Sequence, residues 1–433
     1  MTTADDDTAA RIAALNGPDA DRHARDFAHL AERLANSGVD VESVLARLGR
    51  LRIAVPSWAL GTGGTRFGRF SEPGEPTTIF EKIDDIAMLD ALTRANAEVS
   101  LHIPWDEPDD ADALRAHLDE RAIACGPINS NTFQDRGRPV EPRSSYKFGA
   151  VSNAWEEAQS RAVDHMLQVI ALGERLGSRA LTVWLSDGSN HPGQQNFRAA
   201  LDRTIDNLAR VHAALPAGWL MYTEHKPFEP AFYSSVNPDW GTSLLIARAL
   251  GPQCRCLVDL GHHLPNANIE QIVATLLRER RLGGFHFNDS KYGDDDLTAG
   301  SVKPFQLFLI CNELVAAAAD GLHADRAPDL MIDASHNVKD PMEDLLQSTE
   351  AILLAFAQAM IVDRASLAQA QAANDAALAQ ECLQDAFRSD VRPLVREVRR
   401  RAGGALHPMH ALRALGYRAT VASRRGSIRA TGL

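Results

Sequence analysis

Four side chains that can bind a metal each stand near the end of a short apolar run in the chain: Glu224, Asp259, His286 and Asp333. Carboxylates gathered in one cavity are costly unless a cation neutralises them. Oxygen and imidazole donors without thiolates favour Mn²⁺, Mg²⁺ or Co²⁺ over a structural zinc ion. If the four runs are successive strands, we expect these side chains to converge on one divalent ion.

A second group of donors lies close to the first in the sequence. Asp294 and Asp296 are two residues apart and could chelate a second ion together with His262. Asp259 precedes His262 by three residues across Gly261, a turn short enough for its carboxylate to bridge both sites. Two ions a few Å apart polarise adjacent oxygens of one substrate and activate a bound water.

Aromatic residues and one lysine accompany these donors. Trp58, Trp105 and Trp184 stand at or just beyond the ends of other apolar runs, and Phe133 follows a further one. Such residues pack in a core or form the apolar wall on which the C–H faces of a sugar stack. Lys226 shares a strand face with the first acidic donor, because alternate residues of a strand point the same way. With a metal pair, these side chains suit a small polyhydroxylated substrate.

Alternating strand and helix patterns predict the frame that brings these distant residues together. Amphipathic stretches such as Asn153–Leu176 and Ile269–Arg280 separate eight apolar or β-branched runs that predict strands: Arg52–Trp58, Val99–Trp105, Ala124–Ser130, Ala180–Leu185, Trp219–His225, Cys254–Leu260, Gly283–Asp289 and Asp329–Ser335. Eight such units over about 280 residues match an α/β fold of the (β/α)₈ type, a TIM barrel, whose active sites form at the carboxyl ends of the strands. An open doubly wound sheet is the alternative, but GTGGTRFGRF after the first run fits neither a dinucleotide-binding nor a P-loop pattern.

Helical segments flank the predicted barrel. Residues 1–50 predict two helices, Asp19–Asn36 and Val41–Leu48, and residues 344–387 are rich in Ala and Leu. The tail from Arg388 contains eleven Arg and two acidic residues, which favours an intersubunit contact or a solvated helix on an otherwise acidic chain. We therefore expect N-terminal helices at 1–50, a catalytic barrel at 51–343, and a helical extension for oligomerisation at 344–433.

Composition limits the class of protein. The 433 residues are 45% hydrophobic and 24% charged, which excludes wholesale disorder. The net charge of −12 disfavours nucleic acid or an anionic membrane as partner. Five Cys without a C-x-x-C pattern indicate neither a disulfide framework nor a four-thiolate zinc site. Neither a signal peptide nor an apolar stretch of 18 residues is evident, so we expect a cytoplasmic protein.

Several sequence strings together resemble bacterial L-rhamnose isomerase, most closely the broad-specificity branch that also interconverts D-allose and D-allulose (psicose). The most specific string is GGFHFNDSKYGDDDL, and the supporting strings include VPSWALGTGGTRF, VSLHIPWD, CLVDLGHH and IDASHNV. The resemblance extends from about residue 25 to residue 420 and implies a xylose-isomerase-like (β/α)₈ barrel, a homotetramer and two divalent ions per subunit. Mn²⁺ is the expected ion, with Co²⁺ or Mg²⁺ as alternatives.

The resemblance also implies roles for individual residues. A structural ion would be bound by Glu224, Asp259, His286 and Asp333, and a catalytic ion by His262, Asp294 and Asp296. The sugar contacts fall on His102, Trp184, Lys226, Ser335, His262 and Asp294, with walls from Trp58, Trp105 and Phe133, and with Phe67 reaching the site of a neighbouring subunit. His102, Lys226 and Asp333 are the expected catalytic residues. Departures at Gln134–Arg143, His191 and Pro227 affect substrate preference rather than reaction type.

The reaction implied is an aldose–ketose isomerisation, in which hydrogen moves between C1 and C2 either as a hydride or through an enediol. His102 is the candidate for opening the sugar ring and Lys226 for stabilising charge on the carbonyl oxygen. A ketose 3-epimerase is the nearest rival, but it needs two glutamates, and Glu224 is the only glutamate at a predicted strand end. A non-catalytic sugar-binding protein is the alternative outside enzymes.

Overall fold

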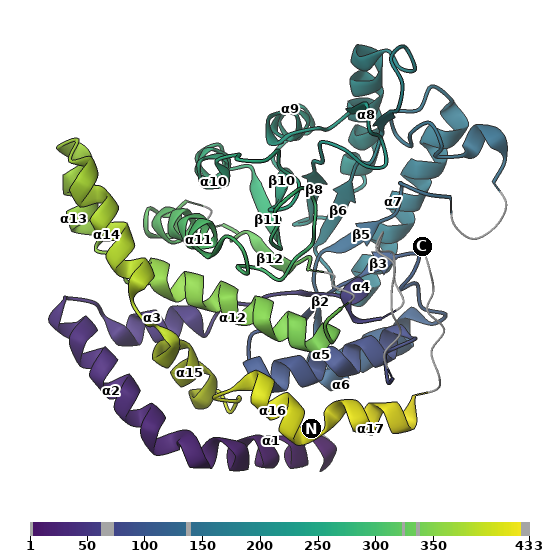
Figure 1. Ribbon diagram of the computed structural model, residues 1–433. Helices are drawn as coiled ribbons and strands as arrows, with labels where there is room; N and C mark the ends of the chain where they lie inside the picture. Colours follow the sequence, from purple (N-terminus) through teal and green to yellow (C-terminus); the bar gives the residue numbers. More distant parts are fainter. Residues whose placement is uncertain (1–2, 62–72, 136–139, 323–324, 335–337, 426–433) are drawn as a thin grey trace.

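The protein is an eight-stranded parallel barrel. The computed structural model describes residues 3–61, 73–135, 140–322, 325–334 and 338–425 (Figure 1). Its main sheet has the order β12-β11-β10-β8-β6-β5-β3, and a smaller sheet has the order β1-β2-β4. The strands of these two sheets are β1 Val55–Pro56, β2 Glu98–Ser100, β3 His102–Ile103, β4 Ala124–Cys125, β5 Ile128–Ser130, β6 Ala180–Trp184, β8 Leu220–Glu224, β10 Cys254–Asp259, β11 Leu282–Phe287 and β12 Asp329–Ile332.

The two sheets form one closed ring. Strands β2 and β3 are separated only by Leu101, and both pair with the β4–β5 segment, so each of these two segments counts as one barrel strand. Ala54 closes the ring, because its N–H donates to Leu330 O at 2.8 Å and its carbonyl accepts from Ile332 N at 3.0 Å. The predicted (β/α)₈ fold and its eight strand segments are therefore confirmed.

Among the residues that the structure describes, eight helices surround the ring, one after each strand segment: α5 Ile79–Thr93, α6 Ala111–Arg121, α7 Glu156–Leu176, α8 Phe197–Ala213, α9 Trp240–Leu250, α10 Ile269–Arg278, α11 Pro304–Ala319 and α12 Pro341–Met360. A capping box between Thr78 and Glu81 starts α5, and Gly177 ends α7 at a φ of 85°. Helix α12 contacts both α11 and α5, so it is the eighth helix of the barrel. The boundary predicted at residue 343 falls inside it.

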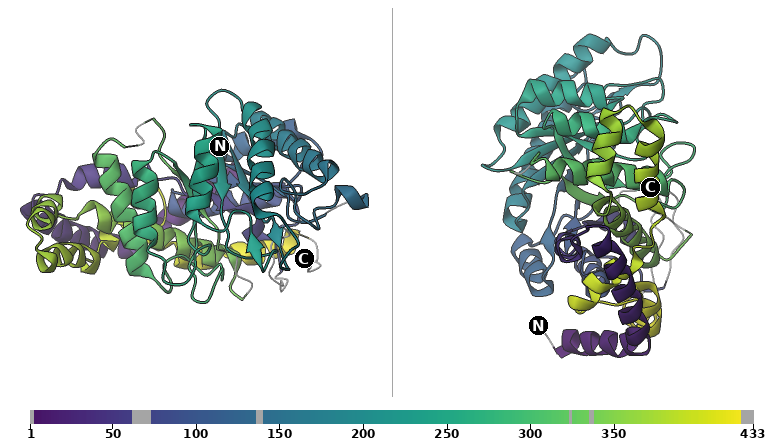
Figure 2. Two further views of the ribbon diagram at one scale, coloured as in Figure 1. Left: turned by 90° about the horizontal axis from the view of Figure 1, so that it is seen from above. Right: turned by 90° about the vertical axis from the view of Figure 1, so that its left-hand side faces the viewer.

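The helices outside the barrel come from both ends of the chain. They are α1 Thr3–Asn16, the 3₁₀ turn η1 Gly17–Asp19, α2 Ala20–Asn36, α3 Val41–Leu48, α13 Arg364–Ala372, α14 Ala376–Arg388, α15 Arg392–Arg401, α16 Pro408–Leu415 and α17 Tyr417–Arg424. Those before residue 50 and those after residue 390 lie together along one side, whereas α13 and α14 stand apart from them, and α14 contacts the barrel helix α12 (Figures 1 and 2). Helix α15 contacts α2 and α3, and α16 contacts α1. The prediction of two helices before residue 50 was wrong, because α1 also forms. This Ala-rich helix has no apolar stripe that would reveal it.

Short elements interrupt the regular alternation at the mouth. Two of them are the 3₁₀ turn η2 Pro142–Ser144 and the antiparallel pair of β7 Gly188–Ser189 with β9 Ser234–Ser235. The short helix α4 Ser57–Leu60 follows β1 directly, so Trp58 lies on a helix. The prediction that a strand extends from Arg52 to Trp58 was wrong at this end. The predicted strand Val99–Trp105 stops at Ile103, because Pro104 has no N–H to continue the ladder.

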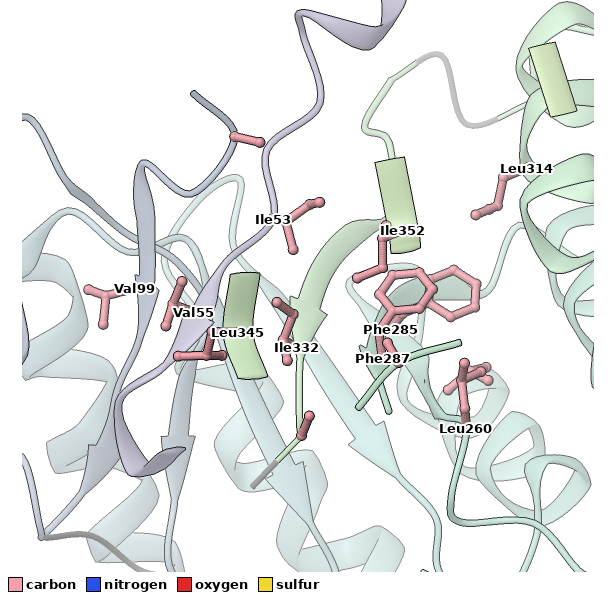
Figure 3. Packing of buried hydrophobic residues seen from close by; sticks show 14 of the residues in the cluster. Ile53, Val55, Val99, Leu260, Phe285, Phe287, Leu314, Ile332, Leu345 and Ile352 are labelled. Atoms are coloured by element: carbon pink, nitrogen blue, oxygen red, sulfur yellow. The ribbon is translucent and has the colours of Figure 1, made fainter. Parts of the chain in front are cut away.

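Buried apolar residues between the barrel wall and its helices fix which strand residues face inward. Phe285 and Phe287 of β11 are fully buried and stack with ring centroids 5.0 Å apart. Figure 3 shows them near Ile352 of α12 and Leu260. The residue between the two phenylalanines, His286, therefore points into the barrel. The same alternation directs Glu224 and Asp259 toward the barrel axis.

Among the described residues, no single helix has the length and apolar character of a membrane span. Helices α12 and α13 would meet that test only as a pair, and they are bent by 66°.

Candidate active site

A cavity of about 380 Å³ opens at the carboxyl ends of the strands. Its lining residues come from most of the strand ends and from the loops that follow them. They include Trp58, His102, Phe133, Gln134, Trp184, Glu224, Lys226, Glu229, His262, His286, Asp296 and Asp333. Residues predicted at or after all eight strands thus meet at one mouth, as the barrel fold requires.

The first predicted ligand group is assembled on β8, β10, β11 and the end of β12. One donor atom from each of Glu224, Asp259, His286 and Asp333 lies within 4.8 Å of all the others. His286 Nδ1 is 3.1 Å from Glu224 Oε1, 3.6 Å from Asp259 Oδ2 and 3.5 Å from Asp333 Oδ2. A single cation could contact all four side chains.

A second group adjoins the first and shares Asp259 with it. Donor atoms of Asp259, His262 and Asp294 also lie within 4.8 Å of one another. His262 Nε2 is 3.2 Å from Asp294 Oδ2 and 3.9 Å from Asp259 Oδ2. Within the described part of the chain, Asp296 lies outside this close group. It nevertheless lines the same cavity, from a loop position with a φ of 46°.

Asp259 is held in place by one oxygen and presents the other to the site. Its Oδ1 accepts hydrogen bonds from Asn288 Nδ2 at 2.9 Å and from Gly261 N at 2.7 Å. Its Oδ2 is buried and accepts no hydrogen bond from any residue that the structure describes. A buried carboxylate oxygen that accepts no hydrogen bond is costly, and a bound cation would satisfy it.

The field around the two donor groups favours positive charge. Burial alone would lower the pKa of His262, but Asp259 and Asp294 outweigh it and raise the pKa to about 10. Burial likewise would raise the pKa of Glu224, but His286 and His262 hold it well below its usual range. Asp333 differs, because burial raises its pKa to about 6. The donor types and this field fit hard divalent cations.

Trp58, Phe133 and Trp184 form an aromatic wall of the cavity. The predicted wall residue Trp105 is not among the lining residues and contacts this wall through Phe133. The ring centroids of Phe133 and Trp184 are 4.6 Å apart. Trp105 stacks on Phe133, with ring centroids 5.8 Å apart and an interplanar angle of 16°. Lys226 Nζ lies 5.0 Å over the Trp184 ring, and it contacts Asp294 Oδ2 at 2.5 Å. A buried ammonium therefore faces both the aromatic wall and the second donor group.

Comparison with known proteins identifies the family. The model of the xylose isomerase-like TIM barrel family matches residues 89–306. A probable sugar isomerase of Rhizobium meliloti (strain 1021) is 50% identical over 422 residues, which cover 97% of this chain and 96% of the relative. The chain belongs to the xylose isomerase-like TIM barrel family.

Two further similarities agree with this family. A probable sugar isomerase of Mesorhizobium japonicum is 49% identical over 404 residues, 93% of each chain. A solved structure of an L-ribulose 3-epimerase superposes with a TM-score of 0.53 at 16% sequence identity, covering 75% of this chain and 98% of the epimerase. At that identity the epimerase shows the shared xylose isomerase-like barrel and nothing finer.

His102 lines the cavity of this xylose isomerase-like barrel as a buried, neutral imidazole. It is almost completely buried, and burial lowers its pKa to about 3. Its ring lies 4.5 Å from that of Trp105 and 5.6 Å from that of Trp58. An imidazole that stays neutral at physiological pH can accept or relay a proton of a bound sugar hydroxyl.

Trp58 has a second function that the sequence did not predict. Its Nε1 donates to Asp333 Oδ1 at 2.7 Å, so it orients a candidate metal ligand as well as forming part of the wall. Phe67 and Ser335, the two remaining predicted sugar contacts, lie outside the described residues.

Several other residues of the site were missed, and three of them make defined contacts there. Glu229 lines the cavity and binds Lys226, Asn288 holds Asp259, and Asp106 accepts a hydrogen bond from His102 N at 2.8 Å. All three follow predicted strands or end them, in the strings EHKPFE, HFND and HIPWD. Position after a strand was the only available signal, and it marks many residues that do not reach the cavity.

Proposed function

We propose that this protein is a divalent-metal-dependent aldose–ketose isomerase. The observation that carries the proposal is the pair of donor groups that share Asp259 and line a cavity beside Lys226. The two relatives, which are 50% and 49% identical to this chain, are both named probable sugar isomerases. Their names support a sugar isomerisation for this protein as well. We further propose L-rhamnose and D-allose as the aldoses and L-rhamnulose and D-allulose as the ketoses, on the sequence resemblance described above.

Each donor group has a distinct role in this proposal. Glu224, Asp259, His286 and Asp333 would hold a structural ion, and His262, Asp294 and Asp296, with Asp259 beside them, a catalytic ion. Bound ions, Mn²⁺ first and Co²⁺ or Mg²⁺ as alternatives, would supply Lewis acidity toward adjacent sugar oxygens and lower the pKa of a bound water.

The protein's own side chains would orient the sugar and manage its charge. Lys226, 2% exposed, places a fixed positive charge beside the cavity, where it stabilises negative charge on a carbonyl oxygen. His102, with its lowered pKa, exchanges a proton with the ring oxygen or the anomeric hydroxyl as the sugar opens. Trp58, Phe133 and Trp184 cover the C–H faces and exclude water.

A ketose 3-epimerase remains the second reading of the same cavity. Glu224 was predicted to be the only glutamate at a strand end, but Glu229, in the loop that follows the same strand, also lines the cavity. However, Glu229 is paired with Lys226, at 2.9 Å between Oε2 and Nζ. A carboxylate in an ion pair is a poor second acid–base group for a reaction that needs two.

The first experiment is a substrate panel with defined metals. The protein is stripped with a chelator, reloaded with Mn²⁺, Co²⁺ or Mg²⁺, and incubated with L-rhamnose, D-allose and other aldoses. We expect ketose formation that depends on added metal and is fastest with L-rhamnose or D-allose. In parallel incubations with L-rhamnulose and D-allulose, conversion of these ketoses only to their C3 epimers would establish the epimerase instead. Sugar binding without turnover of any aldose or ketose would exclude both.

Assembly and cellular location are part of the same proposal. The resemblance supports a cytoplasmic homotetramer in which the helices of residues 1–50 and 344–433 contribute to subunit contacts around the barrel of residues 51–343. Light scattering coupled to size-exclusion chromatography measures the mass directly; a monomer of 47.1 kDa would contradict this assembly.

A further inference from the structure

Glu229 is a cavity residue with no role in the proposed function so far. It follows the end of β8 by five residues. Its backbone φ of 67° is in the left-handed region, which is unfavourable for residues other than glycine. Its side chain is 28% exposed and lies at the rim of the cavity. The loop therefore holds this carboxylate in place against a local conformational cost.

The carboxylate of Glu229 is directed at Lys226. Its Oε2 accepts a hydrogen bond from Lys226 Nζ at 2.9 Å, and Nζ also contacts Asp294 Oδ2 at 2.5 Å. The ammonium is thus shared between a rim carboxylate and a carboxylate of the second donor group. Charge-assisted hydrogen bonds of this kind are the stronger ones in proteins.

Asp294 faces competing demands on one oxygen. Its Oδ2 is 2.5 Å from Lys226 Nζ and 3.2 Å from His262 Nε2. A divalent ion in the second group would need the negative charge of Asp294, and it would repel the ammonium beside it. The ammonium of Lys226 can move away from Asp294 and stay in an ion pair if another carboxylate accepts its hydrogen bond. The carboxylate of Glu229 already lies within hydrogen-bond distance of it.

We propose that Glu229 is a positioning residue that holds Lys226, so that Asp294 is available to a divalent cation while the ammonium stays over the sugar site. The part of this inference that concerns the sugar rests on the proposed function. The part that concerns the cation does not, because metal binding can be measured without any substrate.

The test compares Mn²⁺ binding to the wild-type protein and to Glu229→Gln, a change that keeps the shape and removes the charge. Calorimetric titration of the chelator-treated protein should show the weaker Mn²⁺ site lose about tenfold in affinity and the tighter site remain unchanged. With an active aldose, kcat should fall about tenfold and KM should change less than about threefold. Glu229→Asp, which keeps the charge, should recover part of both losses.

A double-mutant cycle with Lys226→Met decides whether Glu229 acts through the lysine. In the Lys226→Met background, Glu229→Gln should cause no further loss of Mn²⁺ affinity, because no ammonium then competes for Asp294. Glu157→Gln, on an exposed ion pair with Arg143, is the matched control for loss of a glutamate charge.

Two results would overturn the inference: wild-type Mn²⁺ affinity in Glu229→Gln, or an equal loss in both backgrounds. If no aldose is turned over at all, the proposed function fails, while the Mn²⁺ titration still tests the role of Glu229. A urea unfolding curve for each variant distinguishes a local effect from loss of the fold.

Discussion

Asp259 is the residue on which the two donor groups depend. Hydrogen bonds from Asn288 and Gly261 fix one carboxylate oxygen, and the second oxygen faces both groups. Supporting hydrogen bonds of this kind orient a ligand before the metal arrives. The site is therefore preorganised at its most shared position, and loss of that one charge should affect both groups.

Asp259→Asn tests this dependence. The amide oxygen can still accept from Gly261 N, so the fold should survive, but both groups lose a negative donor. We expect turnover to fall by about 10³-fold or more and the rise in Tm on adding Mn²⁺ to disappear. Calorimetry and metal analysis of the dialysed protein measure the binding. Retention of both Mn²⁺ ions in this variant would mean that Asp259 is not the shared ligand.

At the scale of the elements, a buried ion pair joins three parts of the site's frame. Asp106, after β3, accepts from Ser57 Oγ of α4, from His102 N of β3, and from Lys82 Nζ of α5 at 2.7 Å. Lys82 and Asp106 are 2% and 1% exposed. Removing one member of a buried pair leaves an uncompensated charge, which costs far more than the pair contributes in net stability.

Lys82→Met should consequently lower the free energy of unfolding by about 3–5 kcal/mol. Because Asp106 also positions the segment of His102, we expect kcat for an aldose to fall while the Mn²⁺ affinity stays close to wild type. Urea unfolding and calorimetry separate the two effects. The surface variant Glu157→Gln serves as the reference. Equal losses of unfolding free energy in both variants would show that the buried pair contributes no more to stability than an exposed ion pair.

At the scale of the whole molecule, the arginine-rich tail ties the two ends of the chain to the barrel. The sequence favoured an intersubunit contact or a solvated helix for this tail, but many of its arginines pair within the same chain. Their partners include Glu42, Asp85, Asp340, Glu343 and Glu350. The local excess of positive charge thus complements acidic residues of the N-terminal helices and the barrel.

Glu397 of α15 lies at the centre of one such group, and its stability effect should depend on pH. Hydrogen bonds from Arg400, Arg401 and His23 lower the pKa of Glu397 from its ordinary 4.5 to about 2. A carboxyl group whose pKa is lower in the folded state stabilises that state fully above its unfolded pKa. The contribution is then lost as the pH falls from about 4.5 to about 2.

Glu397→Gln should therefore reduce stability by about 1.5–3 kcal/mol at neutral pH and flatten the pH dependence below 4.5. Unfolding in urea at several pH values between 7 and 3 measures both effects. An undiminished slope below pH 4.5 in the variant would assign the acid sensitivity to other carboxylates.

The sequence predicted the barrel and the candidate ligands on its strands because both follow from local periodicity. His286 lies between two buried phenylalanines, and Glu224 and Asp259 end strands that are buried throughout. Residues in loops were harder, because their direction depends on backbone angles that no periodicity encodes, such as the φ of 46° at Asp296 and 67° at Glu229. The hydrogen bond from Trp58 to Asp333 joins residues that are 275 positions apart in the sequence. It forms only in the folded chain, so no local pattern predicts it.

The packing of the first helices on the last ones has a consequence for synthesis of the chain. Arg11 donates to Leu415 O and Asn16 to Gly404 O, across 404 and 388 positions. The barrel ring also closes only when Ala54 meets β12. During translation, α1 to α3 thus leave the ribosome long before their C-terminal partners α15 and α16 exist, with Leu30, Leu34 and Val44 still exposed. Native folding must be largely post-translational, and we expect the nascent chain to need protection by chaperones until its final helices emerge.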